Sequence, residues 1–174
     1  MVKKRGKSKK AQEIFGMSFG MIFAVILIIF FVVIAFIVIK QFLCTQDCAK
    51  TGIFFSELNN KVKDAWDSGD ITSTYSIDLP SQVRDVCFAD LTAHNFDSNS
   101  AAGETIQRYG AEDNLFLYAP KKTCCDFSSY HIDHLDITKI TASENPYCIN
   151  LSKGRGSLVV DMQNNEKYVS IRRR

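Results

Sequence analysis

The sequence has 174 residues, a mean hydropathy of -0.05 and a formal net charge of +2 at pH 7. These averages conceal two different parts, because residues 41–174 carry 14 Lys and Arg residues against 18 Asp and Glu residues, a net charge of -4. A domain that binds nucleic acid needs a basic face, so this balance argues against a nucleic-acid partner. Removing the first 40 residues leaves 134, enough for one compact domain with its own core.

Residues 14–39 contain no charged side chain. As a helix these 26 residues reach about 39 Å, more than the bilayer's hydrocarbon core of about 30 Å. An ordinary core helix needs a polar face, and a secretory signal has a shorter apolar region with a small-residue cleavage site. Bulky Phe42 and Leu43 before Cys44 also argue against a lipidation site. We therefore predict a transmembrane helix over residues 14–39, with the lipid bilayer as its partner.

The charges that flank this run predict its orientation. The far side begins with Lys40 and then has no charge until Asp47. Six basic residues crowd the first ten positions: Lys3, Lys4, Arg5, Lys7, Lys9 and Lys10. Positively charged flanks stay in the cytoplasm, so we predict that residues 1–13 form a basic cytoplasmic tail. The chain is then a single-pass protein of the cell membrane whose C-terminal part lies outside.

Small residues recur along one face of the predicted membrane helix. Gly16, Gly20 and Ala24 follow one another at a spacing of four. Small side chains let two helix backbones approach closely, and this drives helix packing in lipid. Glycine and alanine are also common in membrane helices in general, so the pattern is consistent with ordinary lipid-facing surface as well. We expect this face to be the place where two copies would associate.

Residues 40–69 are predicted to form a juxtamembrane and amphipathic helix. Within 53–66 the apolar residues Phe54, Leu58, Val62 and Trp66 recur at a spacing of four, which is typical of a helix with one apolar stripe. Gly69 follows as a C-terminal cap. The sequence contains no proline between residues 14 and 66, so this helix can continue directly from the membrane helix.

Beyond residue 69 the pattern changes to that of strands and turns, and residues 70–174 are predicted to form a β-rich domain. Strands are expected within 71–80, 83–91, 114–120, 130–137, 147–151, 157–162 and 167–172, with a short helix within 101–110. The turn-forming connectors "SKGRG" and "QNNE" predict an antiparallel meander for the last three strands. Strands that follow a helix in this way indicate an α+β fold with a small antiparallel domain.

All six cysteines lie beyond the predicted membrane helix: Cys44, Cys48, Cys87, Cys124, Cys125 and Cys148. An even number in an extracytoplasmic compartment predicts disulfides, although the sequence alone does not select among 15 pairings of six cysteines. Cys87 and Cys148 each lie in a predicted strand, so we favour that pair, which leaves the other four to pair among themselves.

One segment, "CCDFSSYHIDHLD", brings together residue types that bind zinc: Cys124, Cys125, His131 and His134. The spacing does not match the usual zinc motifs, and on a strand the two histidines would face opposite sides. Asp133 and Asp136 flank His134, but no nucleophile motif or phosphate loop accompanies them. We therefore expect no metal, no cofactor, no small-molecule substrate and no enzymatic activity. Asn150-Leu151-Ser152 is an N-glycosylation acceptor pattern, which makes Asn150 a candidate modification site.

Four stretches carry a resemblance: "EIFGMSFGMIF", "CAKTGIFFSELNNKVKDAW", "LPSQVRDVCFADL" and "NPYCINLSKGRGSLVV". Together they resemble uncharacterised single-span membrane proteins of small-genome archaea. The resemblance covers most of the chain and implies an architecture, but no mechanism and no functional residue. A weaker similarity links "KKAQE" to the cleavage site of archaeal prepilins, with Ala11 before Gln12. Glu13 departs from that pattern, which places its glutamate several residues into the helix.

Two functions fit these observations. The first is an anchored envelope protein whose disulfide-bearing outer domain binds another protein or has a structural role. The alternative is a pilin-like fibre subunit that a prepilin peptidase processes, because pilin subunits combine a long helix, apolar in its first half and amphipathic in its second, with a β-rich head. The two readings differ in whether residues 1–11 are removed.

Overall fold

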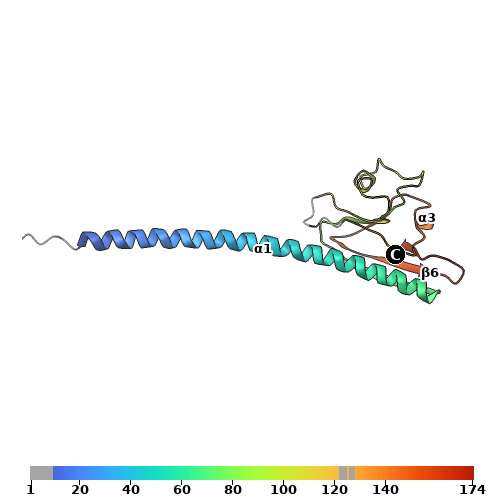
Figure 1. The fold of residues 1–174 in the computed structure, drawn as a ribbon, viewed down its shortest axis with the longest axis horizontal. Coiled ribbons are helices and arrows are strands. Elements are labelled where there is room, and N and C mark those ends of the chain that lie inside the picture. The colour runs from blue at the N-terminus through green and yellow to red at the C-terminus, as the bar shows by residue number, and fades with distance from the viewer. Residues whose placement is uncertain (1–9, 122–124, 126–127) are drawn as a thin grey trace, which may run out of the picture. The chain divides into compact units, whose positions relative to one another are not determined.

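The computed structural model describes residues 10–121, 125 and 128–174, and for residues 10–18 it describes the backbone only. One helix, α1 (Lys10–Ser68), covers both segments that the sequence predicted to be helical. The chain divides into two units, residues 1–43 and 44–174. The first unit consists of helix in its described part, and the second contains the last part of α1 and all the strands (Figure 1).

The second unit has an α+β fold with two antiparallel sheets. The first sheet has the order β1-β6-β7, formed by β1 (Ile71–Asp78), β6 (Arg155–Met162) and β7 (Ser170–Arg173). The second has the order β4-β3-β2-β5, formed by β4 (Ser129–Tyr130), β3 (Leu115–Tyr118), β2 (Asp85–Phe88) and β5 (Tyr147–Asn150). Two short helices, α2 (Gly103–Ile106) and α3 (Ile137–Ile140), complete the unit. The fold class therefore agrees with the prediction.

The main core lies between α1 and the two sheets. Helix α1 contributes Phe54, Leu58 and Val62 of the predicted apolar stripe, and Leu58 and Val62 are completely buried. Trp66, the fourth predicted member, is 40% exposed and lies outside this core. In Figure 1 this part of α1, drawn in teal and green, runs along the strands of the unit. Both sheets contribute to the same cluster, with Tyr75, Ile77, Leu158 and Val160 from the first sheet and Val86, Phe88, Leu115, Leu117 and Ile149 from the second.

A second, smaller core lies on the other face of the β2–β3 pair. Cys87 and Phe116 point into it, together with Ile106 of α2. Strands β2 and β3 are therefore buried on both faces, because successive side chains of a strand point to opposite sides. This explains why residues 86–89 and 115–118 read as continuous apolar runs and not as strict alternation.

Two turns place glycine where the backbone requires it. Gly69 has a φ of +74° just after the end of α1, and its N–H donates to the carbonyl of Ala65 at 3.1 Å, as the predicted cap requires. Between β5 and β6, Lys153 and Gly154 both have positive φ values, 52° and 78°. A side chain at Gly154 would lie 2.2 Å from the carbonyl oxygen of Leu79, so this position requires glycine for space as well.

The predicted meander of the last three strands is wrong. β6 and β7 pair as expected, but β5 pairs with β2 in the other sheet. The turn at 153–154 has the expected chemistry, and only the bridge between Ser152 and Arg155 joins its two sides. Beyond it, β6 pairs with β1 over eight residues. The turn therefore connects two strands of different sheets, because β6 pairs with β1 in the first sheet and β5 pairs with β2 in the second.

The predicted strand over 130–137 is also wrong in most of its length. Only Ser129–Tyr130 is a strand, β4. His134 has a left-handed φ of 64°, which breaks an extended chain. The Asp136 side chain then accepts a hydrogen bond from the Lys139 N–H at 2.9 Å and caps helix α3. The second half of the predicted strand is therefore a turn at His134 followed by the N-terminus of α3.

Candidate functional site

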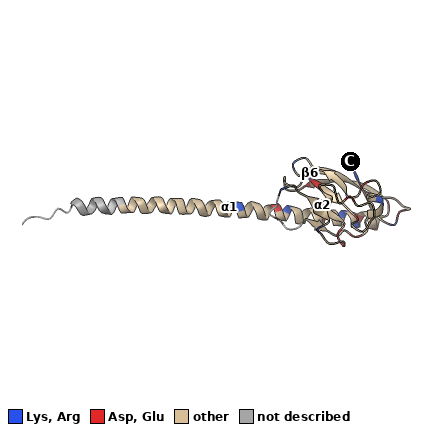
Figure 2. Ribbon diagram, turned by 90° about the horizontal axis from the view of Figure 1, so that it is seen from above, with Lys and Arg blue, Asp and Glu red and all other residues tan. Residues whose placement is uncertain are grey.

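The first unit presents an apolar surface on all sides. From Phe19 to Leu43 every residue is exposed within the chain itself, including the large apolar ones. Figure 2 shows most of this segment in tan, and Lys40 is the one charged residue within it. Its length and composition are those of a helix that can cross a membrane. A helix that is apolar all round needs an apolar environment, which in this unit the protein does not supply.

The small-residue face of this helix is open where it is described. A side chain added at Gly20 would meet no atom within 4 Å. Ala24 is exposed as well, and the side-chain position at Gly16 lies outside the described part. Among the described residues α1 is the one helix of membrane-spanning length, so self-association stays a prediction.

Among its described residues the second unit has two disulfides. Cys87 and Cys148 occupy directly opposed positions of β2 and β5, with Cα atoms 4.0 Å apart, and they form the bond that their strand positions predicted. Cys48 of α1 bonds to Cys125, with a Cα separation of 5.1 Å. Cys44 lies one turn before Cys48 on α1 and is partly buried, whereas Cys124 lies outside the described residues. The bonds connect α1 to a distant loop and fix the edge strand β5 to β2.

The predicted cysteine and histidine cluster is not assembled as a metal site in the part of the chain that the structure describes. Cys125 is oxidised in its bond with Cys48. The His131 ring contacts the Glu112 carbonyl oxygen through Nδ1 and lies 3.3 Å from an Asp133 oxygen through Nε2. His134 instead stacks on Trp66 of α1, with ring centroids 3.9 Å apart. Among the described residues no three side chains of the metal-binding types come together.

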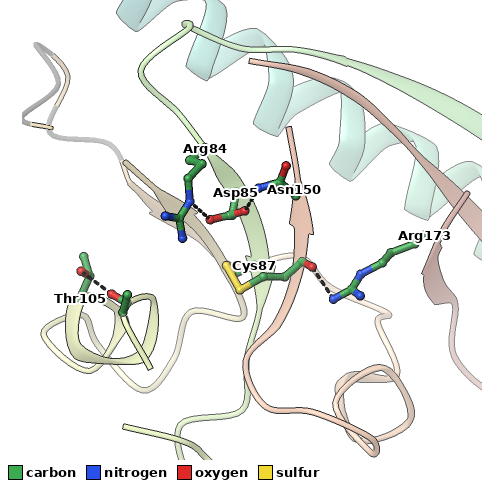
Figure 3. Close-up of polar contacts among 8 residues, drawn as sticks. Arg84, Asp85, Cys87, Thr105, Asn150 and Arg173 are labelled. Carbon is green, nitrogen blue, oxygen red and sulfur yellow. Dashed lines mark hydrogen bonds and ion pairs between the residues drawn. A yellow bond between two sulfur atoms is a disulfide. The ribbon is translucent and has the colours of Figure 1, made fainter. Parts of the chain in front are cut away.

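A buried carboxylate organises the most polar cluster of the unit. Asp85 accepts one hydrogen bond from Arg84 Nε at 2.7 Å and another from Asn150 Nδ2 at 2.8 Å (Figure 3). The hydrogen bond to Asp85 raises the pKa of Arg84, whose guanidinium also lies 4.7 Å from the centre of the Tyr118 ring. Both oxygens of Asp85 are occupied, so the cluster is a structural connection between β2 and β5. The candidate glycosylation site Asn150 is exposed, and its amide nitrogen takes part in this cluster.

Arg173 connects the two sheets, a role that the sequence did not reveal. Its Nη2 atom donates to the carbonyl oxygen of Cys148 at 2.6 Å, and its backbone N–H donates to the Tyr147 hydroxyl at 2.9 Å. The guanidinium also pairs with Glu144 (Figure 3 shows the Arg173 side chain directed at β5). β7 and β5 belong to different sheets, so this residue joins their ends.

Tyr75 and Glu57 connect β1 to α1. The Tyr75 hydroxyl donates to a Glu57 carboxylate oxygen at 2.9 Å. Burial of the ring, followed by the hydrogen bond to Glu57 and the charge of that carboxylate, raises the pKa of Tyr75 well above its usual range. A groove of about 230 Å³ opens beside this contact, lined by Lys50, Ile53, Phe54, Glu57, Tyr75, Ser76 and Asp78.

A second concave region lies near the start of the unit. This cavity of about 400 Å³ is lined by residues from α1, α2 and β3 and by the loops around them, among them Asp47, Thr51, Val83, Arg108, Leu117 and Lys121. Its polar groups carry charges of both signs, and the described contacts do not direct them at one point. The cavity therefore offers volume without an arrangement of groups that would define a reaction.

No known protein family, curated protein or solved structure matches the chain. The resemblance to archaeal membrane proteins and to pilins therefore stays a prediction. The function has to be inferred from the apolar helix, the disulfides and the surfaces of the second unit.

Proposed function

We propose that this chain is a single-pass protein of the cell membrane that holds a disulfide-bearing domain on the outside, where the domain binds another protein or has a structural role. The observation that carries the proposal is the direct passage, within one helix, from a charge-free segment into a compact unit with two disulfides. The charge-free segment supports membrane insertion, and disulfides persist in oxidising compartments outside the cytoplasm. The basic residues before the segment support a cytoplasmic N-terminus.

A binding role is favoured over catalysis by the chemistry of the second unit. Its most buried carboxylate, Asp85, has both oxygens engaged by neighbouring side chains. A general acid or base must have an atom within reach of a substrate. No described group of the unit combines such an atom with a nucleophile in a defined cavity. We therefore assign the domain to protein interaction or to a structural role in the envelope.

Two measurements on native membranes test the anchor. We expect the chain to stay with the membrane fraction in alkaline carbonate, which releases peripheral proteins, and we expect external protease to remove the second unit from intact cells. A chain that carbonate releases would contradict the anchor. A second unit that protease reaches only after lysis would contradict the proposed orientation.

A pilin-like fibre subunit is the second candidate. It is favoured by the continuous helix of 59 residues, which is apolar in its first part and packs an apolar stripe against an antiparallel domain in its second. Such a subunit would lose its basic tail and leave the bilayer. The native N-terminus separates the two candidates.

A further inference from the structure

Strand β1 leaves one long edge of the first sheet open. Its eight residues pair with β6 on one side, and among the described residues no other segment forms backbone hydrogen bonds with it. In an antiparallel strand every second residue directs its N–H and C=O away from the paired side. Edges of this kind are commonly protected by shortness, charge or proline. Residues 72–77 of β1 have neither a charge nor a proline.

The other sheet edges of the unit are protected in these ways. β7 has four residues and ends in Arg172 and Arg173. β5 has four residues and is bonded to β2 through Cys148, and β4 has only two residues. Among the described edge strands β1 is thus the longest, and its only charged residue is Asp78 at its end.

The groove beside β1 gives this edge a second feature. Helix α1 forms one wall with Lys50, Ile53 and Glu57. Ile53 is 56% exposed, although it belongs to the helix that supplies the core. Two contacts join α1 to β1, one before and one after Ile53 along the helix. Lys50 lies 3.5 Å from Asp78, and the Tyr75 hydroxyl donates to Glu57 at 2.9 Å. The groove therefore presents a basic, an apolar and an acidic side chain in this order along the helix.

We propose that the open edge of β1 and this groove bind an extended segment of a partner protein by β-strand addition. The added strand pairs its backbone with β1, and its alternate side chains enter the groove. Charge complementarity assigns their chemistry: an acidic side chain that takes the place of Asp78 in its exposed ion pair with Lys50, an apolar one at Ile53 and a basic one at Glu57. The inference rests on the proposed binding role and names the kind of partner that the outer domain would take.

A second copy of the chain fits this edge less well. Lys50 contacts Asp78, and Glu57, further along α1, contacts Tyr75, so α1 and β1 run antiparallel. A symmetric pairing would bring residues 72–77 of a second β1 to the edge. These residues carry no charge, so they supply neither the acidic nor the basic side chain that complements the groove.

The test uses the full chain in phosphatidylcholine nanodiscs and an acetylated, amidated peptide, Thr-Glu-Thr-Leu-Thr-Lys-Thr. In antiparallel addition to β1 this peptide directs Glu, Leu and Lys into the groove. We expect it to slow amide hydrogen exchange at the outward N–H groups of β1 at least tenfold. A control peptide with proline in place of the third and fifth threonines keeps the three groove side chains but loses two backbone donors. It should give no protection.

Variants of the protein distinguish specific binding of the peptide in the groove from nonspecific binding to exposed apolar surface. Ile53→Asp should raise the dissociation constant of the peptide at least tenfold. The matched control is Tyr168→Asp, which changes another exposed apolar side chain, 39% exposed, that does not line the groove. It should leave the dissociation constant within twofold. A peptide with Glu and Lys exchanged should bind at least fivefold more weakly.

Absence of protection at β1 would overturn the proposal, and equal binding of the charge-exchanged peptide would overturn the assigned chemistry. Two copies per nanodisc that Ile53→Asp separates, without any protection by the peptide, would assign the edge to a second copy and overturn it as well. These outcomes do not contradict the proposed membrane anchor, because in each of them the chain has entered the nanodisc. Failure of the chain to enter nanodiscs would instead contradict the proposed function.

Discussion

At the scale of single residues, Tyr75 joins a strand to the helix through one partly buried hydrogen bond to Glu57. We expect Tyr75→Phe to lower the free energy of unfolding by about 1 to 3 kcal/mol at pH 8, because the acceptor is a carboxylate. The raised pKa of Tyr75 makes its contribution complete below the ordinary tyrosine pKa of about 10. Above that pH the contribution is progressively lost, because the unfolded chain ionises first.

Urea unfolding of both proteins in detergent micelles at pH 8 and pH 11 measures this change. The cost of the substitution should be smaller at pH 11 than at pH 8. The other tyrosines are present in both proteins and cancel in the difference. An equal cost at the two pH values would show that the Tyr75 hydroxyl titrates alike in the folded and unfolded chains.

The bond between Cys87 and Cys148 closes a loop across a sequence separation of 61 residues. A crosslink of this length restricts the unfolded chain, and its loss typically costs about 2 to 4 kcal/mol. We therefore expect the double variant Cys87→Ala, Cys148→Ala to unfold at a clearly lower urea concentration than the wild type. The single variant Cys148→Ala, which also lacks the bond, should account for most of this loss. A double variant as stable as the wild type would contradict the expectation.

At the scale of elements, the last part of α1 belongs to the core of the second unit. Leu58 is fully buried there, whereas Ile53, five residues earlier, is 56% exposed. We expect Leu58→Ala to cost about 2 to 5 kcal/mol, because it removes apolar contacts and leaves a cavity. Ile53→Ala should cost less than about 0.5 kcal/mol, since it lies on the surface. Urea unfolding of the two variants measures the contrast, and similar costs would mean that the stripe does not face the core.

The first part of α1 is apolar on all sides, so its packing in lipid depends on side-chain size. We expect Gly20→Ile to weaken any dimer, because a branched side chain holds two backbones apart at the face of Gly16, Gly20 and Ala24. An association assay in bacterial membranes measures the effect. Ile22→Leu, on the opposite side of the helix, is the matched control and should change nothing. An unchanged signal for Gly20→Ile would leave this face as ordinary lipid-facing surface.

At the scale of the whole molecule, the fold class followed from local patterns, whereas the pairing of strands did not. The stripe of Phe54, Leu58 and Val62 predicted a core helix because helical periodicity is local. The partner of β5 depends on the register of Cys148 with Cys87, which are 61 residues apart in sequence. Turn chemistry at Lys153–Gly154 described the turn correctly but could not show that its two strands enter different sheets.

The candidate site was predictable to a similar degree. The cysteine content indicated disulfides, and strand positions favoured Cys87 with Cys148. The groove beside β1 could not be predicted, because its walls come from α1 and from a strand that begins beyond Gly69. The sequence shows only one sign of the groove, the apolar residue Ile53 beside the predicted stripe. His134 belongs to a residue type that binds zinc, but it stacks on Trp66 at a position with a left-handed backbone, and the sequence pattern revealed neither feature.

The fate of the basic tail decides between the two functions of the whole molecule. We expect residues 9–40 to be neither removed nor cut. The apolar run is too long for a secretory signal and lacks its cleavage site. Positive charge in the tail holds that end in the cytoplasm, and an anchor benefits from keeping it. Processing of a prepilin kind would cut after Ala11 and leave Gln12-Glu13 at the head of the helix, with the glutamate in the wrong position for a pilin.

Mass spectrometry of the N-terminal peptide from native membranes measures the outcome. The anchor predicts peptides that contain residues from the basic tail before Ala11. A native N-terminus at Gln12 would replace the anchor with the fibre subunit. A variant with Ala11→Leu serves as the control, because a prepilin peptidase needs a small residue before the cut. Under the anchor proposal this change has no effect on the N-terminal peptide, whereas in a fibre subunit it would block processing and retain the chain in the membrane.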